Sequence, residues 1–201
     1  MRVSARRNKQ GGFSLIETMM AIGILVVGIL SLAAVLANAI EYMTTAQYNY
    51  IAQQKASEAI ESIFSARDVG QATWNQICNA GAVAVCPSGI FLNGALPLCG
   101  PGNDGILGTA DDYNGASCAG LAANAAPDAI LFPNQGTGVY GATPVSVPLT
   151  NFKRTIAIGN VTAAGGGTVP NLRQITVTIT YSAERFQNLT YTLSTYISSV
   201  P

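Results

Sequence analysis

An uninterrupted apolar run near the start of the chain constrains the fold more than any other feature. Residues 18–37 contain no charge and no proline, and most of them are Ala, Ile, Leu, Val, Met or Gly. A run of about 20 such residues is long enough to cross a bilayer core as a helix. Residues 1–12 before it carry four basic side chains and no acid. Since positive charge beside the first apolar segment holds that end in the cytoplasm, we expect the rest of the chain on the outer side.

A cleaved secretory signal peptide is the alternative interpretation of this segment. Such a peptide has a shorter apolar core, about 7 to 15 residues, which ends in an A-x-A-like cleavage site. Residues 37–39, Ala-Asn-Ala, match that site loosely. The apolar core is longer here and continues into a helical pattern, which favours a retained membrane helix.

Glu17 lies at the head of the apolar run, where a carboxylate is costly. An acid in the first turns of a membrane helix costs a few kcal/mol unless it is compensated. The helix N-terminus offers about 0.3 to 2 kcal/mol through its N–H groups and dipole. The next basic residue along the chain is Lys55, so the run itself holds no cation. Either Glu17 lies at the headgroup level beside Lys9, or another molecule brings it a positive partner.

Residues 12–17, GFSLIE, follow a short basic leader and resemble the class III signal of type IV pilins and type II secretion pseudopilins. The resemblance implies that a prepilin peptidase cuts after Gly12 and methylates the new N-terminus at Phe13. It also implies that Glu17, then the fifth residue, pairs with the terminal amine of a neighbouring subunit in a fibre. The motif covers only the first quarter of the chain.

Within this family the chain is most similar to PilV-type minor pilins, on residues 12–17, the apolar residues 22–30 and the strands near the end. This implies a structural subunit that acts in pilus assembly or modification. It would be anchored in the bacterial inner membrane, with residues 68–201 forming a globular head in the periplasm. It would then be carried in the fibre. The implied partners are other pilin subunits, the prepilin peptidase and the inner membrane. Major pilins usually have a proline where this chain has Ala34, and often a C-terminal disulfide loop. This sequence shows neither feature, which argues against a major pilin.

Two other functions fit the same anchor. A minor pseudopilin of a type II secretion system would share the signal and much of the head. A membrane-anchored binding module would instead use a loop of the head to recognise a ligand and would not need Glu17.

Composition argues against catalysis and nucleic-acid binding. The chain has no histidine, which removes Ser-His-Asp and Cys-His catalysis and histidine metal sites. Without the four basic residues of the leader, six basic residues remain against ten acidic ones, a net charge of about −4. Such a charge is unlike the basic footprint of nucleic-acid-binding domains. We therefore expect no enzyme and no nucleic-acid partner.

The four cysteines, Cys78, Cys86, Cys99 and Cys118, all follow the apolar run. An even number in an oxidising compartment indicates disulfides. Four cysteines permit three pairings, and the sequence cannot choose among them, although proximity favours Cys78 with Cys86 and Cys99 with Cys118. Zinc binding is the alternative, but the chain has no C-x-x-C pair.

The helical pattern continues past the membrane run, so residues 13–67 are predicted as one helix with its transmembrane half at about 13–37. At 1.5 Å per residue this helix would be about 80 Å long. Apolar residues at mostly helical spacing predict a stripe on its outer half. They are Ile40, Met43, Ala46, Tyr50, Ile51, Ala56, Ala59, Ile60, Ile63 and Phe64. That stripe needs a partner surface.

The remainder of the chain predicts that surface. Residues 68–150 are rich in Gly, Pro and Cys and are expected to be mostly loop, with brief strands at 89–92 and 129–132. Residues 151–201 contain three segments of alternating apolar and polar residues, which predict an antiparallel meander. The expected fold class is α+β and pilin-like, a long N-terminal helix packed on a C-terminal antiparallel sheet.

A loop at residues 103–112 holds the one constellation with possible chemistry, formed by Asn103, Asp104, Asp111 and Asp112. Oxygen ligands on a flexible, glycine-punctuated backbone suit a hard cation such as calcium. The loop lacks the D-x-D-x-D-G spacing and the closing glutamate of an EF-hand. Alternatively it is a pair of turns in which Asn and Asp bond their own backbone. Calcium is the only cofactor that the sequence suggests.

Overall fold

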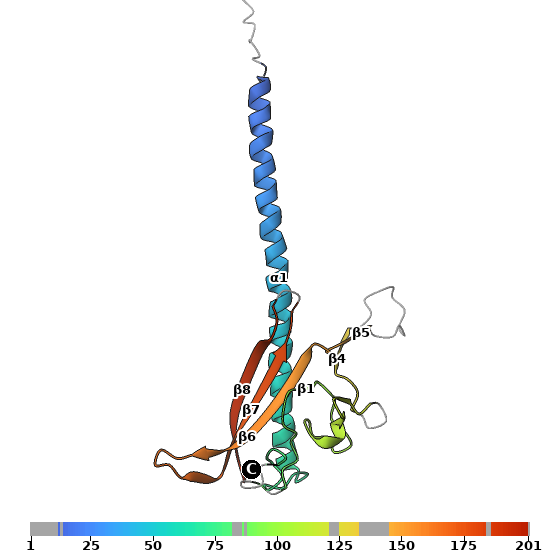
Figure 1. The fold of residues 1–201 in the computed structure, drawn as a ribbon, viewed down its shortest axis with the longest axis vertical. Helices are drawn as coiled ribbons and strands as arrows, with labels where there is room; N and C mark the ends of the chain where they lie inside the picture. Colours follow the sequence, from blue (N-terminus) through green and yellow to red (C-terminus); the bar gives the residue numbers. More distant parts are fainter. Residues whose placement is uncertain are drawn as a thin grey trace, which may run out of the picture. The chain divides into compact units, whose positions relative to one another are not determined.

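The fold is given by a computed structural model, in which, among the residues it describes, one long helix precedes eight strands (Figure 1). Two compact units, Met1–Thr44 and Thr45–Pro201, divide the chain at a point inside that helix. The structure describes residues 12, 14–81, 86, 88–120, 125–132, 145–183 and 186–200.

The helix α1 spans Leu15–Asp68 without interruption. At its start, the carbonyl oxygen of Ser14 accepts hydrogen bonds from the backbone N–H groups of Glu17 and Thr18, at 3.0 and 3.2 Å. At its end, Gly70 has φ +75°, a conformation that glycine adopts at little cost and that turns the chain out of the helix. The long helix expected from the sequence is therefore present.

In the second unit, α1 buries a narrow stripe of small and branched residues. The stripe has helical spacing and consists of Ala52, Ala56, Ala59, Ile60, Ile63 and Ala66. It differs from the predicted stripe, because Tyr50 is 65% exposed and Met43 is 68% exposed. Four residues of the predicted stripe, Ala56, Ala59, Ile60 and Ile63, are buried as expected, and the structure adds Ala52 and Ala66.

The main sheet has the strand order β1-β6-β7-β8, and each neighbouring pair is antiparallel. Ile156 pairs with Val177, and Val177 pairs with Leu193, which fixes the register across the three long strands. These strands are the predicted meander, to which β1 adds a fourth. Their bounds are Leu96–Pro97 for β1, Phe152–Thr162 for β6, Thr168–Tyr181 for β7 and Leu189–Ser198 for β8.

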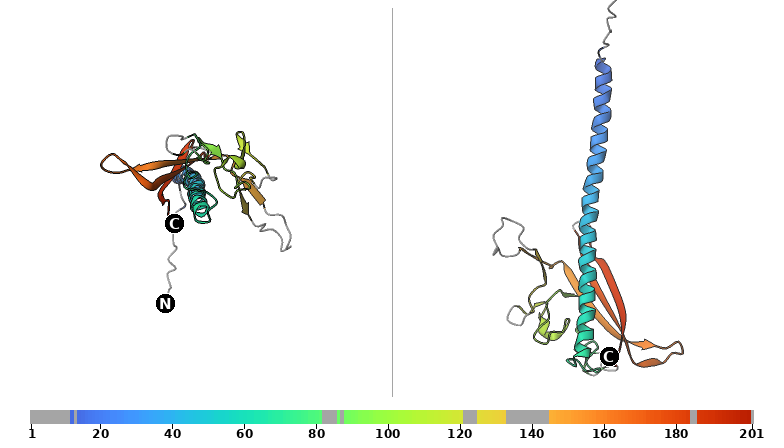
Figure 2. Two further views of the ribbon diagram at one scale, coloured as in Figure 1. Left: turned by 90° about the horizontal axis from the view of Figure 1, so that it is seen from below. Right: turned by 180° about the vertical axis from the view of Figure 1, so that it is seen from behind.

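The second half of α1 covers one face of this sheet (Figure 2). The alternating residues that face the helix are buried, and Ile175, Val177 and Ile179 are each 0% exposed. Phe152 packs edge-on against Tyr48 of the helix and stacks on Tyr181, with ring centroids 5.7 and 5.4 Å apart. The expected α+β fold, a long helix packed on an antiparallel sheet, is confirmed.

Residues between the helix and the sheet contain more structure than the sequence predicted. The predicted strand at 129–132 is β4, but the predicted strand at 89–92 is wrong, since only Phe91 forms an isolated bridge, with Asn79. The chain turns there to lie against residues 78–79. The short elements are η1 (Ala110–Asp112), β2 (Tyr113–Asn114), β3 (Ser117–Cys118), β4 (Ala129–Phe132) and β5 (Val145–Pro148).

Candidate functional site

The N-terminal motif lies at the transition into α1. Gly12 is exposed, and Ser14 provides the carbonyl oxygen that begins the helix. Phe13 and residues 1–11 lie outside the described residues, so the predicted cleavage and methylation stay predictions of the sequence. Gly12 precedes the first residue of α1, Leu15.

Glu17 lies in the first turn of α1 with an exposed side chain. Its carboxylate has no hydrogen bond or ion pair with any residue that the structure describes. The backbone N–H of Glu17 is already bonded to Ser14. A cation for this carboxylate would therefore have to come from another molecule or from the basic residues before Gly12.

The first unit of the chain exposes apolar side chains on all sides of α1. Fifteen large apolar residues from Leu15 to Ile40 are exposed, for example Leu15 at 77% and Ile24 at 73%. At about 1.5 kcal/mol or more for each side chain left in water, the cost would be on the order of 20 kcal/mol. By length and composition, α1 can cross a membrane. A bilayer or the helices of other subunits would remove this cost.

The acidic loop brings its three aspartates together. Each of Asp104, Asp111 and Asp112 offers a carboxylate oxygen, and these oxygens lie within 4.8 Å of one another. The side chain of Asn103 is exposed and has no hydrogen-bond partner among the described residues. The loop is docked on α1, since the backbone N–H of Leu107 donates to the hydroxyl of Ser62 at 3.0 Å.

Asp112 is the buried member of the cluster, at 0% exposure. Its two carboxylate oxygens accept hydrogen bonds from the backbone N–H groups of Gly102 and Gly108, each at 2.6 Å. Burial raises the pKa of Asp112 to about 6, although these two bonds and the charge of Arg154 work to lower it. Gly108 has φ +90°, and a Cβ there would collide with Ile156, so the bond from Gly108 requires glycine.

Hydrogen bonds also satisfy the other two carboxylates. Asp111 accepts bonds from the hydroxyl of Thr109 at 2.7 Å and the backbone N–H of Asp104 at 3.1 Å. Partial burial works to raise the pKa of Asp111, but these bonds outweigh it and lower the pKa. Asp104 accepts a bond from the backbone N–H of Ile106 at 2.8 Å.

The cluster suits a hard cation in the kind and proximity of its oxygens. Each carboxylate is also hydrogen-bonded without an ion, as the turn interpretation of the sequence requires. Calcium binding therefore stays a prediction. The backbone N–H of Asn103 also bonds the carboxylate of Asp111 and helps to lower its pKa, but no bond among the described residues involves the Asn103 side chain.

Two disulfides hold the loops of the head, and they link Cys78 with Cys86 and Cys99 with Cys118. This is the pairing that proximity in the sequence favours. The second bond encloses the whole acidic loop. Since a disulfide restricts mainly the unfolded chain, the second bond lowers the entropic cost of ordering the acidic loop.

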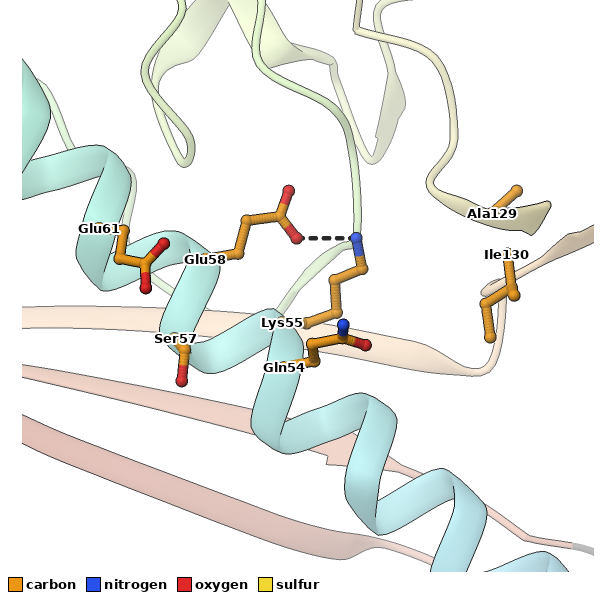
Figure 3. A pocket seen from close by; sticks show the side chains of 7 residues that line it. All are labelled: Gln54, Lys55, Ser57, Glu58, Glu61, Ala129 and Ile130. Atoms are coloured by element: carbon orange, nitrogen blue, oxygen red, sulfur yellow. Dashed lines mark hydrogen bonds and ion pairs between the residues drawn. The ribbon is translucent and has the colours of Figure 1, made fainter.

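A charged cluster that sequence analysis missed lies between α1 and β4 (Figure 3). The ammonium of Lys55 contacts the carboxylates of Asp128 and Glu58 at 2.7 and 2.8 Å. Burial works to lower the pKa of Lys55, but the two carboxylates outweigh it and raise the pKa. A cavity of about 420 Å³ beside them is lined by polar residues of the helix and by Ala129 and Ile130. Only the i,i+3 spacing of Lys55 and Glu58 was visible in the sequence.

Comparison with known proteins identifies the N-terminal segment alone. Residues 7–33 match a family model described as the prokaryotic N-terminal methylation motif. No curated protein and no solved structure matches the chain. The matched segment includes Gly12, Phe13 and Glu17, together with the end of the basic leader and most of the apolar run. The match supports a prepilin-type signal for processing by a prepilin peptidase.

Proposed function

We propose that this chain, which carries a prepilin-type signal and resembles type IV pilins and pseudopilins, is a minor pilin of a type IV pilus. The methylation motif at residues 7–33 carries the proposal. This motif implies processing by a prepilin peptidase, assembly with other pilins and anchoring in the inner membrane, and it suggests a structural protein. The minor role, the pilus system and the periplasmic position of the head are our inference.

The exposed first half of α1 supports assembly through this helix. In the membrane, lipid would cover its apolar side chains, and in a fibre the helices of neighbouring subunits would replace the lipid. A Cβ atom added at Gly23 or Gly28 would meet no other atom within 4 Å, so a neighbouring helix can approach closely there. Moving from lipid to protein would then require no exposure of this surface to water.

The unpartnered carboxylate of Glu17 would set the axial position of the subunit. Cleavage after Gly12 would create an amine at Phe13, and the amine of a neighbouring subunit could reach Glu17. At 4 Å and an effective dielectric constant of about 20, such a pair is worth on the order of 4 kcal/mol. A mispositioned subunit would leave both charges unpaired in an apolar environment.

Helix composition supports a minor role over a bulk one. Major pilins usually have a proline at the position of Ala34, whereas here α1 passes through that position without a break. The rest of the apolar run contains no proline either. The subunit would thus enter the fibre with a straight first half and would prime or modify it.

The test is to determine the mature N-terminus by mass spectrometry of the protein from its own bacterium. We expect a chain that begins with methylated phenylalanine at residue 13. In the same strain, Glu17→Ala should remain processed but be lost from sheared fibres, while the exposed control Glu61→Ala should be incorporated normally. A protein that retains its leader, or that begins near Asn38, would contradict the proposal.

A minor pseudopilin of a type II secretion system is the second candidate, because the same motif serves both systems. Deletion of the gene separates them. Loss of twitching motility with intact enzyme secretion would support the pilus, and the reverse result would support the pseudopilus.

A further inference from the structure

The two edges of the main sheet differ in how they are closed. On the β6 side, β1 pairs with Lys153 and Arg154. Beyond it, the buried side chain of Asn79 donates to the carbonyl oxygen of Ile156 at 2.8 Å and accepts from the N–H of Ile158 at 2.7 Å. The amide of Asn79 thus takes the hydrogen bonds that a further strand would make.

The β8 edge has no such cover. The bonds to Asn79 show that the backbone N–H and C=O groups of Ile156 and Ile158 point away from β7. In an antiparallel sheet this direction alternates from residue to residue, and the register carries the alternation from β6 through β7 to β8. The backbone groups of β8 that point away from β7, toward the open edge, therefore belong to its even-numbered residues. One of them, Ser198, accepts a bond from Arg67 at 3.0 Å. Among the described residues, nothing pairs with the outward backbone groups of the others. These are Thr190, Thr192, Ser194 and Tyr196.

Exposed edge strands in natural proteins normally carry features that prevent pairing, such as prolines, charges, bulges or short length. β8 has ten residues with no proline, glycine or charge, and its ten pairs with β7 are in continuous register. On the helix side, Tyr191 and Leu193 are only partly buried at the border of the core. An additional strand would both satisfy the backbone groups and extend the cover over these side chains.

We propose that β8 pairs with an extended, uncharged strand in the head of a different fibre subunit. This inference rests on the proposed function, which brings other heads beside this one. A second copy of this chain is a poor occupant because its β6 edge is already closed by β1 and Asn79. Copies could pair only β8 with β8, which gives a closed dimer and cannot continue along a fibre. A subunit with one open edge is suited to a single junction, as a minor component requires.

Thr192→Pro tests the edge without breaking the sheet. Proline at residue 192 removes an outward N–H, whereas the bonds to β7 come from residues 191 and 193. We expect an unchanged melting midpoint for the full chain in detergent and at least tenfold less protein in sheared fibres. The control Thr192→Ala keeps the N–H and should be incorporated like the unmodified chain. Incorporation of Thr192→Pro at the normal level would overturn the proposal.

A photo-crosslinking amino acid at Tyr196, which is 57% exposed, identifies the occupant in the bacterium. We expect a cross-link to a strand of another pilin-type subunit, and none from a control position at Asn114 on β2. If the cross-link forms in membranes but no protein is found in fibres, the pairing of β8 is supported and the fibre role is refuted. If the protein is found in fibres but the cross-link is missing, or joins two copies of this chain, the proposed pairing of β8 is overturned and the fibre role stands. If both are absent, both proposals are wrong.

Discussion

The two halves of α1 differ both in composition and in surroundings. From Leu15 to Ile40 every residue is exposed, so no face of the helix is distinguished from another. From Ala52 to Ala66 one stripe is fully buried against the sheet, and the opposite side is polar. The stripe is carried mainly by alanines, whereas the exposed half has the larger Leu, Ile and Met side chains.

This contrast separates two kinds of stability. The second half is stabilised by partners within the chain, namely the sheet, the acidic loop and Asp128. The first half has no such partners among the described residues and depends on lipid or on other molecules. Hydrophobicity alone therefore does not decide which half is buried within the chain.

The same substitution in both halves should have very different effects. Ile63→Ala removes a side chain that is 0% exposed, and the cavity should lower the free energy of unfolding of the head by about 2 to 5 kcal/mol. Ile29→Ala, at a residue 57% exposed, should leave it unchanged. Urea unfolding of the full chain in detergent, followed by Trp74 fluorescence, measures both. Equal effects would mean that the first half also packs within the chain.

The pH dependence of stability should sharpen the contrast, because the acidic loop docks only on the second half. The pKa of Asp112 is raised from 3.8 to about 6 on folding, so the folded chain binds its proton more tightly. The stabilisation from this group is complete below about pH 3.8 and lost as pH rises through about 6. A shift of about two units corresponds to roughly 3 kcal/mol.

Urea unfolding between pH 4 and 7, with a chelator present, measures this loss. Asp112→Asn should flatten the profile. Asp111→Asn should retain the pH profile. The pKa of Asp111 is lowered from 3.8 on folding, so its contribution to stability changes only below about that pH. A profile for Asp112→Asn as steep as that of the unmodified chain would show that another group titrates.

Calcium provides the next test of the acidic loop. If the cluster binds Ca²⁺, a concentration 100 times the dissociation constant should stabilise the head by about 2.7 kcal/mol. Differential scanning calorimetry with calcium and with chelator should then give separate curves, and Asp104→Asn should bring them together. Superimposed curves for the unmodified chain would establish that the loop is held by its hydrogen bonds alone.

The smallest expected effect concerns Lys55, the charged contact of the second half. Its ammonium and the carboxylate of Asp128 are each 17% exposed, so the pair is only partly screened. A double-mutant cycle with Lys55→Met and Asp128→Asn should give a coupling of about 1 kcal/mol. A coupling near zero would mean that the loop before β4 is held by the backbone rather than by this pair.

The fold was largely predictable because its elements have strong local periodicity. Residues 152–158 and 175–181 alternate as half-buried strands, and α1 has no proline or glycine after Gly28 until Gly70. β6 and β7 extend beyond these alternating segments through Gly159 and Pro170, two residue types that usually mark turns. The alternation also placed Arg154 on the inner face, where it is 2% exposed and bonds the carbonyl oxygen of Cys99.

Contacts between distant residues could not be read from one sequence. Asn79 looks like an ordinary loop residue, and nothing in the chain links it to Ile156, 77 positions away. The same is true of Lys55 and Asp128. The three aspartates were found because they are close in sequence, whereas their bonds to Gly102 and Gly108 depend on how the loop closes.

The position of Asn79 beside Cys78 links the closure of the β6 side of the sheet to a disulfide. The bond from Cys78 to Cys86 anchors the segment from which the Asn79 amide reaches β6. The same segment is also held by backbone hydrogen bonds between Cys78 and Phe91 and between Ala80 and Phe91, at 3.2 and 2.8 Å. In the proposed fibre, the disulfide and these bonds would together keep the β6 side of the sheet closed and leave β8 as the edge that can pair.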